Sequence, residues 1–552
     1  MPKFFRILWI LIFLSFCLSL CGQEVAPGDP PDFIYPMDRQ IQLPVPDNAS
    51  AGWAILDHDG KLVKKGRLNV GEETLYFDGL TSGVYYFFHG LSEAEVPNER
   101  SSLDVASSFL LVAPPDALPE DHFFAVAFPH AASFMEAGTA EAESLRFLFR
   151  AMPWLGIHRL RTHFGPRYAP VQSVEEGVAV RDWSLLDRLV GMAEYRKVRF
   201  IAVLDDAPEA LSGKNTGGLA PALPPPDGPA ASAESDDAVS GSLVDDGYAK
   251  ALMRHFGFKL DEFTLWPQPN REGRFFSARQ WIQRLDPVYT MIKRRNRFAS
   301  VSLGGLDVDK ARMQFAGSPA FLDAVFHGGA PFYDVIDIPA PGNFQDSKKL
   351  ALDLQKRSEA SPANRKARAV SAAAIPPSQA NIAGQYAQAS DLLKKIVWYR
   401  FHNYRYFTLE KLSSRGGETS GLFAADPETD NFYPRMTAAV WLHAISLLGN
   451  AKALEDLGHA SEKSEIYAFE QYKKTIFVGW MPLPNAPSNN ETRRIAVTLL
   501  WPDEARGRVL DILGKDITSR RYVQRAPGKH DVILTEEPVF IVVNQTGDGV
   551  GW

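Results

Sequence analysis

The feature that most constrains the fold is an alternation of short apolar strands with amphipathic helices, which begins near Asp121 and continues to about Asn450. Strands are predicted over 123–128, 157–164, 199–206, 262–269, 299–303, 333–339, 366–372 and 398–406, and helices between them over 140–154, 183–195, 278–294 and 385–396. This order and length are typical of a (β/α)8 barrel, and a doubly wound parallel sheet is the competing arrangement. We predict an α/β fold with a (β/α)8 barrel over residues 120–452.

One segment interrupts the alternation after the predicted third strand. Gly213–Gly241 is rich in Gly, Pro, Ala, Ser and Asp and contains the consecutive prolines Pro224–Pro226. Such a composition buries too little apolar surface to fold, so it predicts a disordered insertion.

The sequence on both sides of the barrel has the pattern of antiparallel β structure. Residues 33–115 alternate short apolar runs with turn signals such as Asp59-Gly60 and predict an N-terminal β-sandwich. Residues 456–552 return to short strands and predict a C-terminal β-sandwich.

The start of the chain has the pattern of an export signal. Lys3 and Arg6 precede the apolar run Ile7–Leu20, which suits the core of a signal peptide better than a transmembrane helix. We therefore expect residues 1–21 to be a signal peptide and the protein to be exported from a bacterial cell. Two outcomes stay open: the segment before Cys21 resembles a lipobox, which would attach a lipid to Cys21 in the cell envelope, or the protein is cleaved and secreted.

Composition narrows the functional classes. The chain has 59 basic and 66 acidic residues and a net charge of −7, so nucleic acid is not expected as a partner. Its two cysteines, Cys17 and Cys21, both lie in the signal segment, which leaves no disulfide framework. No phosphate-binding loop and no metal-ligand motif is present, so neither a cofactor nor a metal is expected.

The predicted fourth strand ends in Trp266–Asn270, which resembles the Trp-Asn-Glu-Pro-Asn segment of retaining glycoside hydrolases with barrel folds, especially the xylosidase/iduronidase-like group. Further similar segments follow in the same order along the chain: Leu155–Arg161, Asp182–Asp187, Phe332–Asp337 and Gly421–Met436. The resemblance implies a (β/α)8 fold and a carbohydrate or glycoconjugate as ligand.

The sequence departs from that pattern at both catalytic positions. Retaining glycosidases need two carboxyl groups about 5–5.5 Å apart. The acid/base Glu of the fourth-strand motif is replaced by Gln268, and Ala372 stands where the seventh strand should carry the nucleophile. An amide and a methyl group can neither donate the proton nor attack the anomeric carbon, so we expect the ancestral chemistry to be lost.

Other carboxylates offer an alternative acid pair. Asp206 closes the predicted third strand, and Asp337 lies on the sixth. They could flank a cleft at the wider spacing of inverting enzymes, or they could cap helices or pair with Arg159 and Arg161.

Candidate binding residues are those predicted at strand ends, where barrels form their sites. They are Arg161, His163, Trp266, Gln268, Asn270, Trp398 and His402. Trp266 and Trp398 could equally be core residues, and the two histidines could be structural.

Three functions follow as hypotheses. The leading one is a catalytically degenerate glycoside-hydrolase-like protein that binds carbohydrate or a partner through the barrel cleft. The second is an active glycosidase with Asp206 and Asp337 as a relocated pair, and the third is a structural or adhesive envelope protein.

Overall fold

The computed structural model describes most of the chain between Phe33 and Asn544. The described ranges are 33–37, 40–44, 52–59, 61–67, 74–91, 107–112, 118–135, 140–175, 178–204, 246–270, 278–309, 314–315, 319–378, 381–414, 420–426, 431–457, 459–460, 463–482, 493–502 and 505–544. The predicted signal peptide, the predicted insertion 213–241 and Asp206 lie outside them. Within these ranges, no helix is long and apolar enough to cross a membrane.

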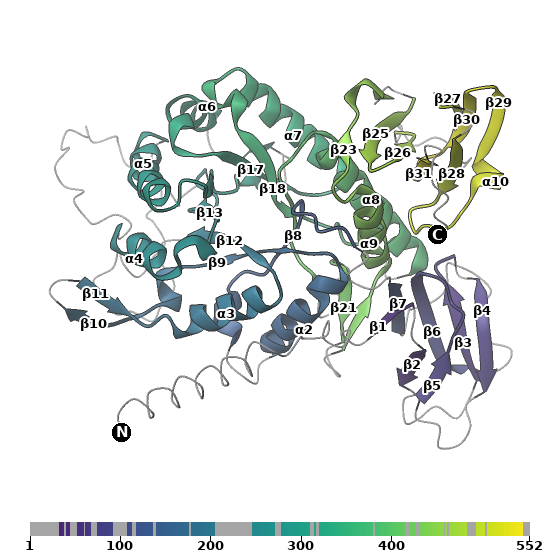
Figure 1. Cartoon of the computed structure of the whole chain (residues 1–552), viewed down its shortest axis with the longest axis horizontal. Helices are drawn as coiled ribbons and strands as arrows, with labels where there is room; N and C mark the ends of the chain where they lie inside the picture. Colours follow the sequence, from purple (N-terminus) through teal and green to yellow (C-terminus); the bar gives the residue numbers. More distant parts are fainter. Residues whose placement is uncertain are drawn as a thin grey trace, which may run out of the picture.

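Eight parallel strands form a closed barrel, which confirms the predicted fold class (Figure 1). The neighbours around the barrel follow the order β12-β13-β14-β17-β18-β19-β8-β9. In chain order the strands are β8 (Phe124–Ala127), β9 (Arg159–His163), β12 (Arg199–Leu204), β13 (Glu262–Leu265), β14 (Ser300–Ser302), β17 (Val335–Ala340), β18 (Ala367–Ala373) and β19 (Phe407–Leu409).

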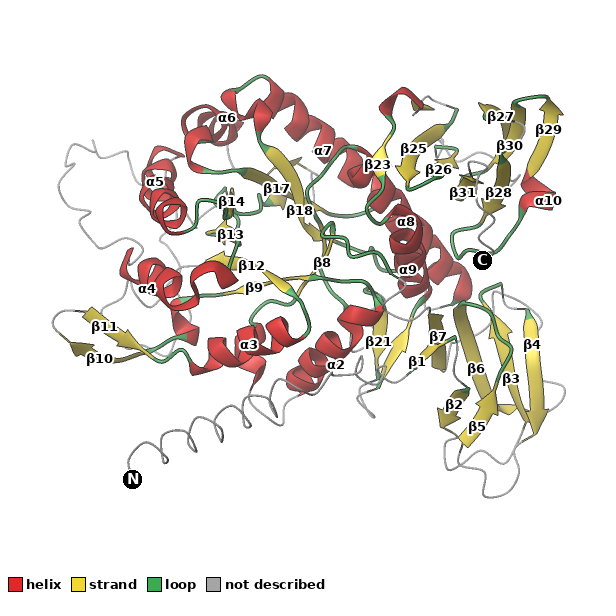
Figure 2. Ribbon diagram, in the orientation of Figure 1, coloured by secondary structure: helices red, strands yellow, loops and turns green. Residues whose placement is uncertain are grey.

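Helices surround this barrel (Figure 2). They are α2 (Ala140–Trp154), α3 (Ser184–Tyr195), α4 (Asp246–Phe256), α5 (Ala278–Arg295), α6 (Pro319–Gly328), α7 (Phe344–Glu359), α8 (Ile382–Phe401) and α9 (Met436–Leu448). Local sequence sets several of their ends. The side chains of Asn343 and Asn381 accept hydrogen bonds from the backbone N–H of Asp346 at 3.1 Å and of Gly384 at 2.8 Å, which caps α7 and α8.

The predicted eighth strand is wrong in position. Residues 398–401 end α8, and the strand that closes the barrel is the three-residue β19. Helix α8 is buried on several faces, from Ile382 through Trp398 and Tyr399. The predicted helix 385–396 lies within α8, but the helix continues through the run Ile396–Phe401, which is apolar and aromatic apart from Arg400. Periodicity cannot distinguish so short an apolar run from a buried strand.

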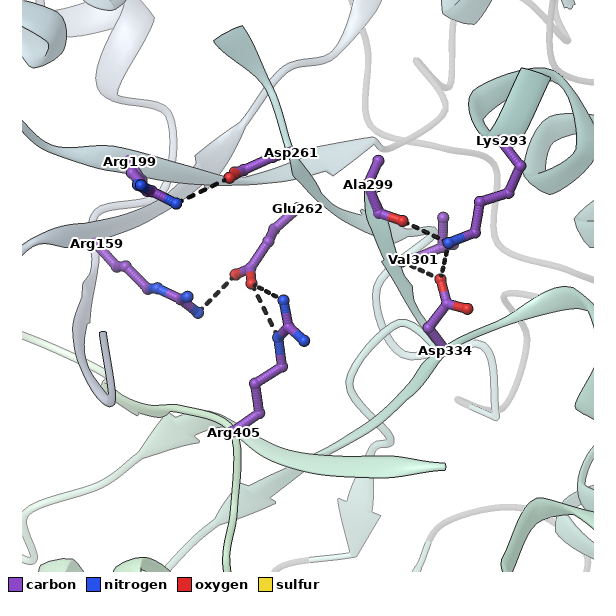
Figure 3. Close-up of polar contacts among 9 residues, drawn as sticks. All are labelled: Arg159, Arg199, Asp261, Glu262, Lys293, Ala299, Val301, Asp334 and Arg405. Carbon is purple, nitrogen blue, oxygen red and sulfur yellow. Dashed lines mark hydrogen bonds and ion pairs between the residues drawn. The ribbon is translucent and has the colours of Figure 1, made fainter. Parts of the chain in front are cut away.

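Charged side chains fill the barrel at the end where its strands begin (Figure 3). Glu262 at the start of β13 accepts hydrogen bonds from Arg159 at 2.8 Å and from Arg405 at 2.8 and 3.0 Å. Nearby, Lys293 pairs with Asp334 at 2.7 Å, and Arg199 with Asp261 at 3.3 Å. The sequence suggested Asp206 or Asp337 as a partner of Arg159, but Arg159 pairs with Glu262.

The N-terminal β-rich region consists of two packed sheets. One has the order β1-β7-β6-β3-β4, and the other pairs β2 with β5. Their bounds are β1 (Ile34–Pro36), β2 (Ile41–Pro44), β3 (Gly52–Asp57), β4 (Leu62–Arg67), β5 (Thr74–Phe77), β6 (Gly83–Leu91) and β7 (Ser107–Val112). Side chains from both sheets, including Ile55, Phe77 and Phe109, share one core cluster.

The C-terminal β-rich region also has two sheets, of order β23-β25-β26-β31-β28 and β27-β30-β29. Their bounds are β23 (Lys452–Ala453), β25 (Glu465–Gln471), β26 (Lys474–Trp480), β27 (Ile495–Leu500), β28 (Arg506–Leu510), β29 (Tyr522–Ala526), β30 (Lys529–Leu534) and β31 (Val539–Asn544). Both β-rich regions lie on the same side of the barrel (Figure 1). Asp59 of the first pairs with Lys515 of the second.

Candidate functional site

The mouth of a (β/α)8 barrel is formed by the segments that follow its strands. Gln268 lies three residues beyond the end of β13, and Ala372 lies at the end of β18. Both are half-buried. The backbone N–H of Gln268 donates to the carbonyl oxygens of Gly304 at 2.8 Å and Gly305 at 3.0 Å. The predicted fourth strand 262–269 ends earlier, at Leu265, so Gln268 lies in the turn that follows it, and Ala372 lies within the seventh strand. Neither residue offers a carboxyl group.

Asp337 lies inside the barrel on β17 with none of its surface exposed. Its Oδ1 atom accepts hydrogen bonds from the backbone N–H of Gly304 at 2.9 Å and of Gly305 at 2.8 Å. Its Oδ2 atom lies 3.6 Å from Nη2 of Arg161. The carboxylate thus holds the turn after β14 and neutralises a guanidinium, as the pairing interpretation expected.

Arg161 and Asn270 are also occupied by protein contacts. Nη1 of Arg161 donates to the carbonyl oxygen of Ser371 at 2.8 Å. The side chain of Asn270 donates to the carbonyl oxygen of Asp307 at 2.9 Å and accepts from its N–H at 2.7 Å. Both residues are buried. Arg161 connects β9 to β18, and Asn270 connects the turn after β13 to the segment after β14.

Trp266 is a core residue. Its exposed fraction is 3%, and it belongs to the main hydrophobic cluster of the barrel. Its backbone N–H donates to the carbonyl oxygen of Leu204 at 2.8 Å, which continues the pairing of β12 with β13. The expectation that its indole stacks on a sugar is corrected, because the ring is buried in this core.

Trp398 and His402 do not lie at the mouth. Trp398 is on α8 with an exposed fraction of 1%, and its ring stacks on His402 at a centroid distance of 4.1 Å. The segment from α8 to β19 leads into the beginning of a strand, at the opposite end of the barrel from the mouth. Burial lowers the pKa of His402, so the two residues are a structural pair.

A cavity of about 270 Å³ opens where β18 and β19 end. Its lining residues are Ala373, Ile375, Pro377, Leu409, Glu410, Lys411, Ser420 and Gly421. The backbone N–H of Glu410 donates to the carbonyl oxygen of Ala373 at 3.0 Å, so this carboxylate-bearing residue lies beside the end of the seventh strand. Sequence reasoning missed Glu410 because it placed the eighth strand too early.

A second group of polar side chains follows β8 and β9. The rings of His130 and His163 lie 4.5 Å apart between centroids, and Nδ1 of His130 lies 2.6 Å from the hydroxyl oxygen of Tyr168. The guanidinium of Arg167 contacts His130 and lies 4.7 Å from the centre of the Tyr168 ring. Of these four residues only His163 was predicted. The other three could have been found, because they directly follow the predicted first and second strands.

Three mouth residues have left-handed backbone angles that are rare outside glycine. They are His130 with φ 62°, Trp266 with φ 45° and Gln268 with φ 59°. Such conformations cost of order 1–3 kcal/mol each and concentrate at functional sites. The described residues contain no group of three or more His, Cys, Asp or Glu side chains arranged to hold a metal ion.

The fold is that of the (β/α)8 glycoside hydrolases, as the sequence resemblance predicted. The chain is similar in structure to a family 39 glycoside hydrolase from the gut symbiont Bacteroides cellulosilyticus WH2, with a TM-score of 0.62 and 18% identity over 93% of this chain and 99% of that one. It is also similar to the catalytic domain of a family 30 xylanase C from Talaromyces cellulolyticus, with a TM-score of 0.49 and 12% identity over 78% and 99% of the chains. No protein-family model and no curated protein matches the sequence. At such identities the similarity establishes the fold alone.

Proposed function

We propose that this chain is an exported glycoside-hydrolase-like protein that binds carbohydrate at the mouth of its barrel and does not hydrolyse glycosidic bonds. The observation that carries the proposal is the chemistry of the strand ends. Gln268 and Ala372 take the two positions where the resemblance requires carboxyl groups, and a retaining mechanism needs both an acid/base and a nucleophile.

Asp337 does not replace either group. Its carboxylate is fully buried and is held by the N–H groups of Gly304 and Gly305 and by the charge of Arg161. A carboxylate held in this way cannot reach a substrate unless the turn after β14 opens. Asp206, its proposed partner, lies outside the described residues. A relocated pair would therefore require Asp337 to break its hydrogen bonds with Gly304 and Gly305 and its ion pair with Arg161.

The cavity beside β18 and β19 is the proposed carbohydrate site. Its volume of about 270 Å³ lies just below the range of pockets for drug-sized ligands, which suits one sugar ring better than a long chain segment. Ile375, Pro377 and Leu409 supply apolar surface, and Glu410, Lys411 and Ser420 supply hydrogen-bonding groups. This mixture is typical of sites that fix the orientation of a small polar ligand.

A glycan-array screen of the full chain tests this proposal. We expect at least one glycan to bind, and Lys411→Ala to weaken that binding about tenfold, since it removes a charged hydrogen-bond donor. Tyr472, which is 80% exposed beyond the end of β25, gives the control Tyr472→Ala. Binding that Tyr472→Ala abolishes and Lys411→Ala leaves intact would place the site in the C-terminal sheets and contradict the proposal.

Glu410 favours residual hydrolysis as a second candidate function. It is a carboxylate at a strand end, beside the position vacated by the nucleophile. One carboxylate can act as base or nucleophile but not as the acid as well, and Gln268 has no proton to donate. Loss of activity in Glu410→Gln, measured on activated aryl glycosides that need no acid, would support this candidate.

We also propose export through residues 1–21, with Cys21 as the site of lipid attachment. Support comes from the charged start and apolar run of this segment. Palmitate labelling of cells that produce the full chain should give a labelled protein, and Cys21→Ala should lose the label. An unlabelled protein found in the medium would favour the secreted form, and a cytoplasmic protein that retains residues 1–21 would contradict export.

A further inference from the structure

Three large aromatic side chains are exposed at the end of the barrel where its strands begin. Tyr195, Phe258 and Phe298 have exposed fractions of 55%, 75% and 77%. Each lies where a helix ends and leads into the next strand: α3 into β12, α4 into β13 and α5 into β14. These three strands are neighbours in the barrel, so the three rings lie in adjacent turns.

Polar contacts join these turns to one another. Nζ of Lys259 lies 2.8 Å from Oε2 of Glu194, and the guanidinium of Arg199 lies 3.3 Å from Asp261 (Figure 3). The backbone N–H of Ser300 donates to the carbonyl oxygen of Asp261 at 2.8 Å. The turns therefore form one continuous surface, which we call the basic aromatic surface and define by the residues 194–199, 257–261 and 293–299.

This surface is strongly basic although the chain is acidic. The whole chain has 59 basic and 66 acidic residues, whereas the basic aromatic surface has eight basic residues and two acidic ones. Both acidic residues, Glu194 and Asp261, are already paired within the surface, and Lys293 pairs with Asp334. Among the residues that the structure describes, no carboxylate forms an ion pair with the other five cations, which are Arg196, Lys197, Arg294, Arg295 and Arg297.

Local contacts hold the exposed rings beside these cations. The guanidinium of Arg196 lies 5.3 Å from the centre of the Tyr195 ring, and that of Arg297 lies 4.6 Å from the centre of the Phe298 ring. Oδ1 of Asn296, which has an exposed fraction of 3%, accepts a hydrogen bond from the backbone N–H of Phe298 at 3.1 Å. An asparagine side chain that bonds the backbone two residues on fixes a turn, so the turn that carries the Phe298 ring is a built feature of the fold.

We propose that the basic aromatic surface docks on a bilayer that contains anionic phospholipid. Exposed apolar side chains rimmed by polar groups mark protein or membrane interaction sites. Aromatic rings lie at the headgroup level of membranes, and lysine and arginine are attracted to anionic lipids. A second copy of the same surface would bring like charges together, so the charge favours the bilayer as partner.

The inference goes beyond the proposed carbohydrate function and does not depend on it. The mouth lies at the ends of the strands, and the basic aromatic surface lies at their beginnings. A chain docked through Tyr195, Phe258 and Phe298 would therefore direct its mouth away from the bilayer, where a glycan could reach it.

Single-cysteine labelling of the full chain tests the proposal. Cys17→Ser and Cys21→Ser remove both natural cysteines and the proposed lipid. Phe298→Cys, or the control Val174→Cys, then carries one environment-sensitive fluorophore. Val174 is 67% exposed on β10 (Val171–Glu175), which follows β9 at the mouth end. On vesicles of phosphatidylcholine and phosphatidylglycerol, we expect the blue-shifted emission of an apolar environment at position 298 and the emission of a water-exposed label at position 174.

The label at position 298 also measures the contribution of charge. Arg294→Gln combined with Arg295→Gln should lower the ratio of docked to undocked chains about fivefold for each cation removed. Arg506→Gln combined with Arg520→Gln removes the same charge from exposed positions of the C-terminal β-rich region and should leave the ratio unchanged. The run Ile7–Leu20 could itself bind vesicles, so the readout is the environment of each label and not binding alone.

Several results would overturn the proposal. They are equal shifts at positions 298 and 174, no shift at either position, and a shift at position 298 that is as large on pure phosphatidylcholine or that persists in the Arg294→Gln and Arg295→Gln chain. A shift that appears without vesicles and grows with protein concentration would mean that a second copy covers the surface, and it also overturns the proposal. None of these results affects carbohydrate binding at the mouth, which the glycan array tests separately.

Discussion

Oδ1 of Asp337 accepts a hydrogen bond from the backbone N–H of Gly304 at 2.9 Å, deep inside the barrel. This contact joins the sixth strand to the turn after the fifth. The same turn accepts the N–H of Gln268 through the carbonyl oxygen of Gly304 at 2.8 Å. The backbone of Gly304 therefore connects the ends of three consecutive strands, β13, β14 and β17, by hydrogen bonds.

Gly304 should tolerate no side chain. Its φ is +115°, and a Cβ would lie 2.5 Å from the carbonyl oxygen of Leu265 and 2.7 Å from that of Trp266. We expect Gly304→Ala to lower the free energy of unfolding by more than about 2 kcal/mol, measured by urea denaturation. In Gly191→Ala, an exposed helix position with no atom within 4 Å of the new Cβ, we expect a gain of about 0.5–1 kcal/mol. If the two substitutions change the unfolding free energy by similar amounts, Gly304 does not connect the strand ends in the way described.

Trp266 should contribute to stability and not to ligand binding. Its ring is almost fully buried in the main cluster, so Trp266→Ala should cost about 3–5 kcal/mol of unfolding free energy. Trp266→Phe keeps most of the apolar contact and should cost less. Glycan affinity of the folded fraction should not change in either variant. If Trp266→Ala lowers the unfolding free energy by less than 1 kcal/mol and weakens glycan affinity tenfold, Trp266 stacks on the ligand, as the sequence suggested.

His443 should make the protein less stable in acid. This ring on α9 packs edge-on against Phe540 at 4.9 Å, and burial lowers its pKa to about 4, against a small opposing effect of Asp511. Between pH 6.5 and about 4, His443 is therefore protonated in the unfolded chain and neutral in the folded chain. The free energy of unfolding consequently falls as the pH falls. The full effect is up to about 3 kcal/mol.

The variant His443→Leu isolates this contribution. Unfolding titrations of both proteins from pH 7 to pH 4 should show a smaller loss of stability in His443→Leu, since its side chain binds no proton in either state. Parallel pH profiles of the two proteins would mean that His443 is charged, or accessible to water, in the folded chain.

The strands could be predicted from the sequence because their short, branched apolar runs are bounded by turn residues. The predicted strand 199–206 is an example, and its residues 199–204 form β12. The predicted helix 385–396 lies within α8, but the end of α8 was wrongly predicted as a strand, because its buried run around Trp398 and Tyr399 is short and apolar. The three-residue β19 is too short to give a pattern of its own, and Glu410, which follows it, was missed for that reason.

The site was only partly predictable because strand position does not fix the direction of a side chain. Gln268 follows β13 and Ala372 lies in β18, the fourth and seventh strands to which chain order assigned them. That they replace two catalytic carboxyl groups stays a prediction. Trp266 lies at the same strand end as Gln268, yet its ring is buried in the core while Gln268 is half-buried. The side chain of Asn270 forms hydrogen bonds with the backbone of Asp307, which is distant in sequence. Tertiary contacts of this kind leave no local signal.

The central claim is that the barrel mouth does not cleave glycosides. The most direct measurement is intact-mass spectrometry of the full chain after incubation with a panel of activated 2-fluoro glycosides, alongside turnover of the matching aryl glycosides. We predict no covalent adduct, and turnover no higher in the wild-type protein than in Glu410→Gln, because Gln268 and Ala372 supply neither proton nor nucleophile. A glycosyl adduct on the wild-type chain, or turnover that Glu410→Gln abolishes, would contradict the account.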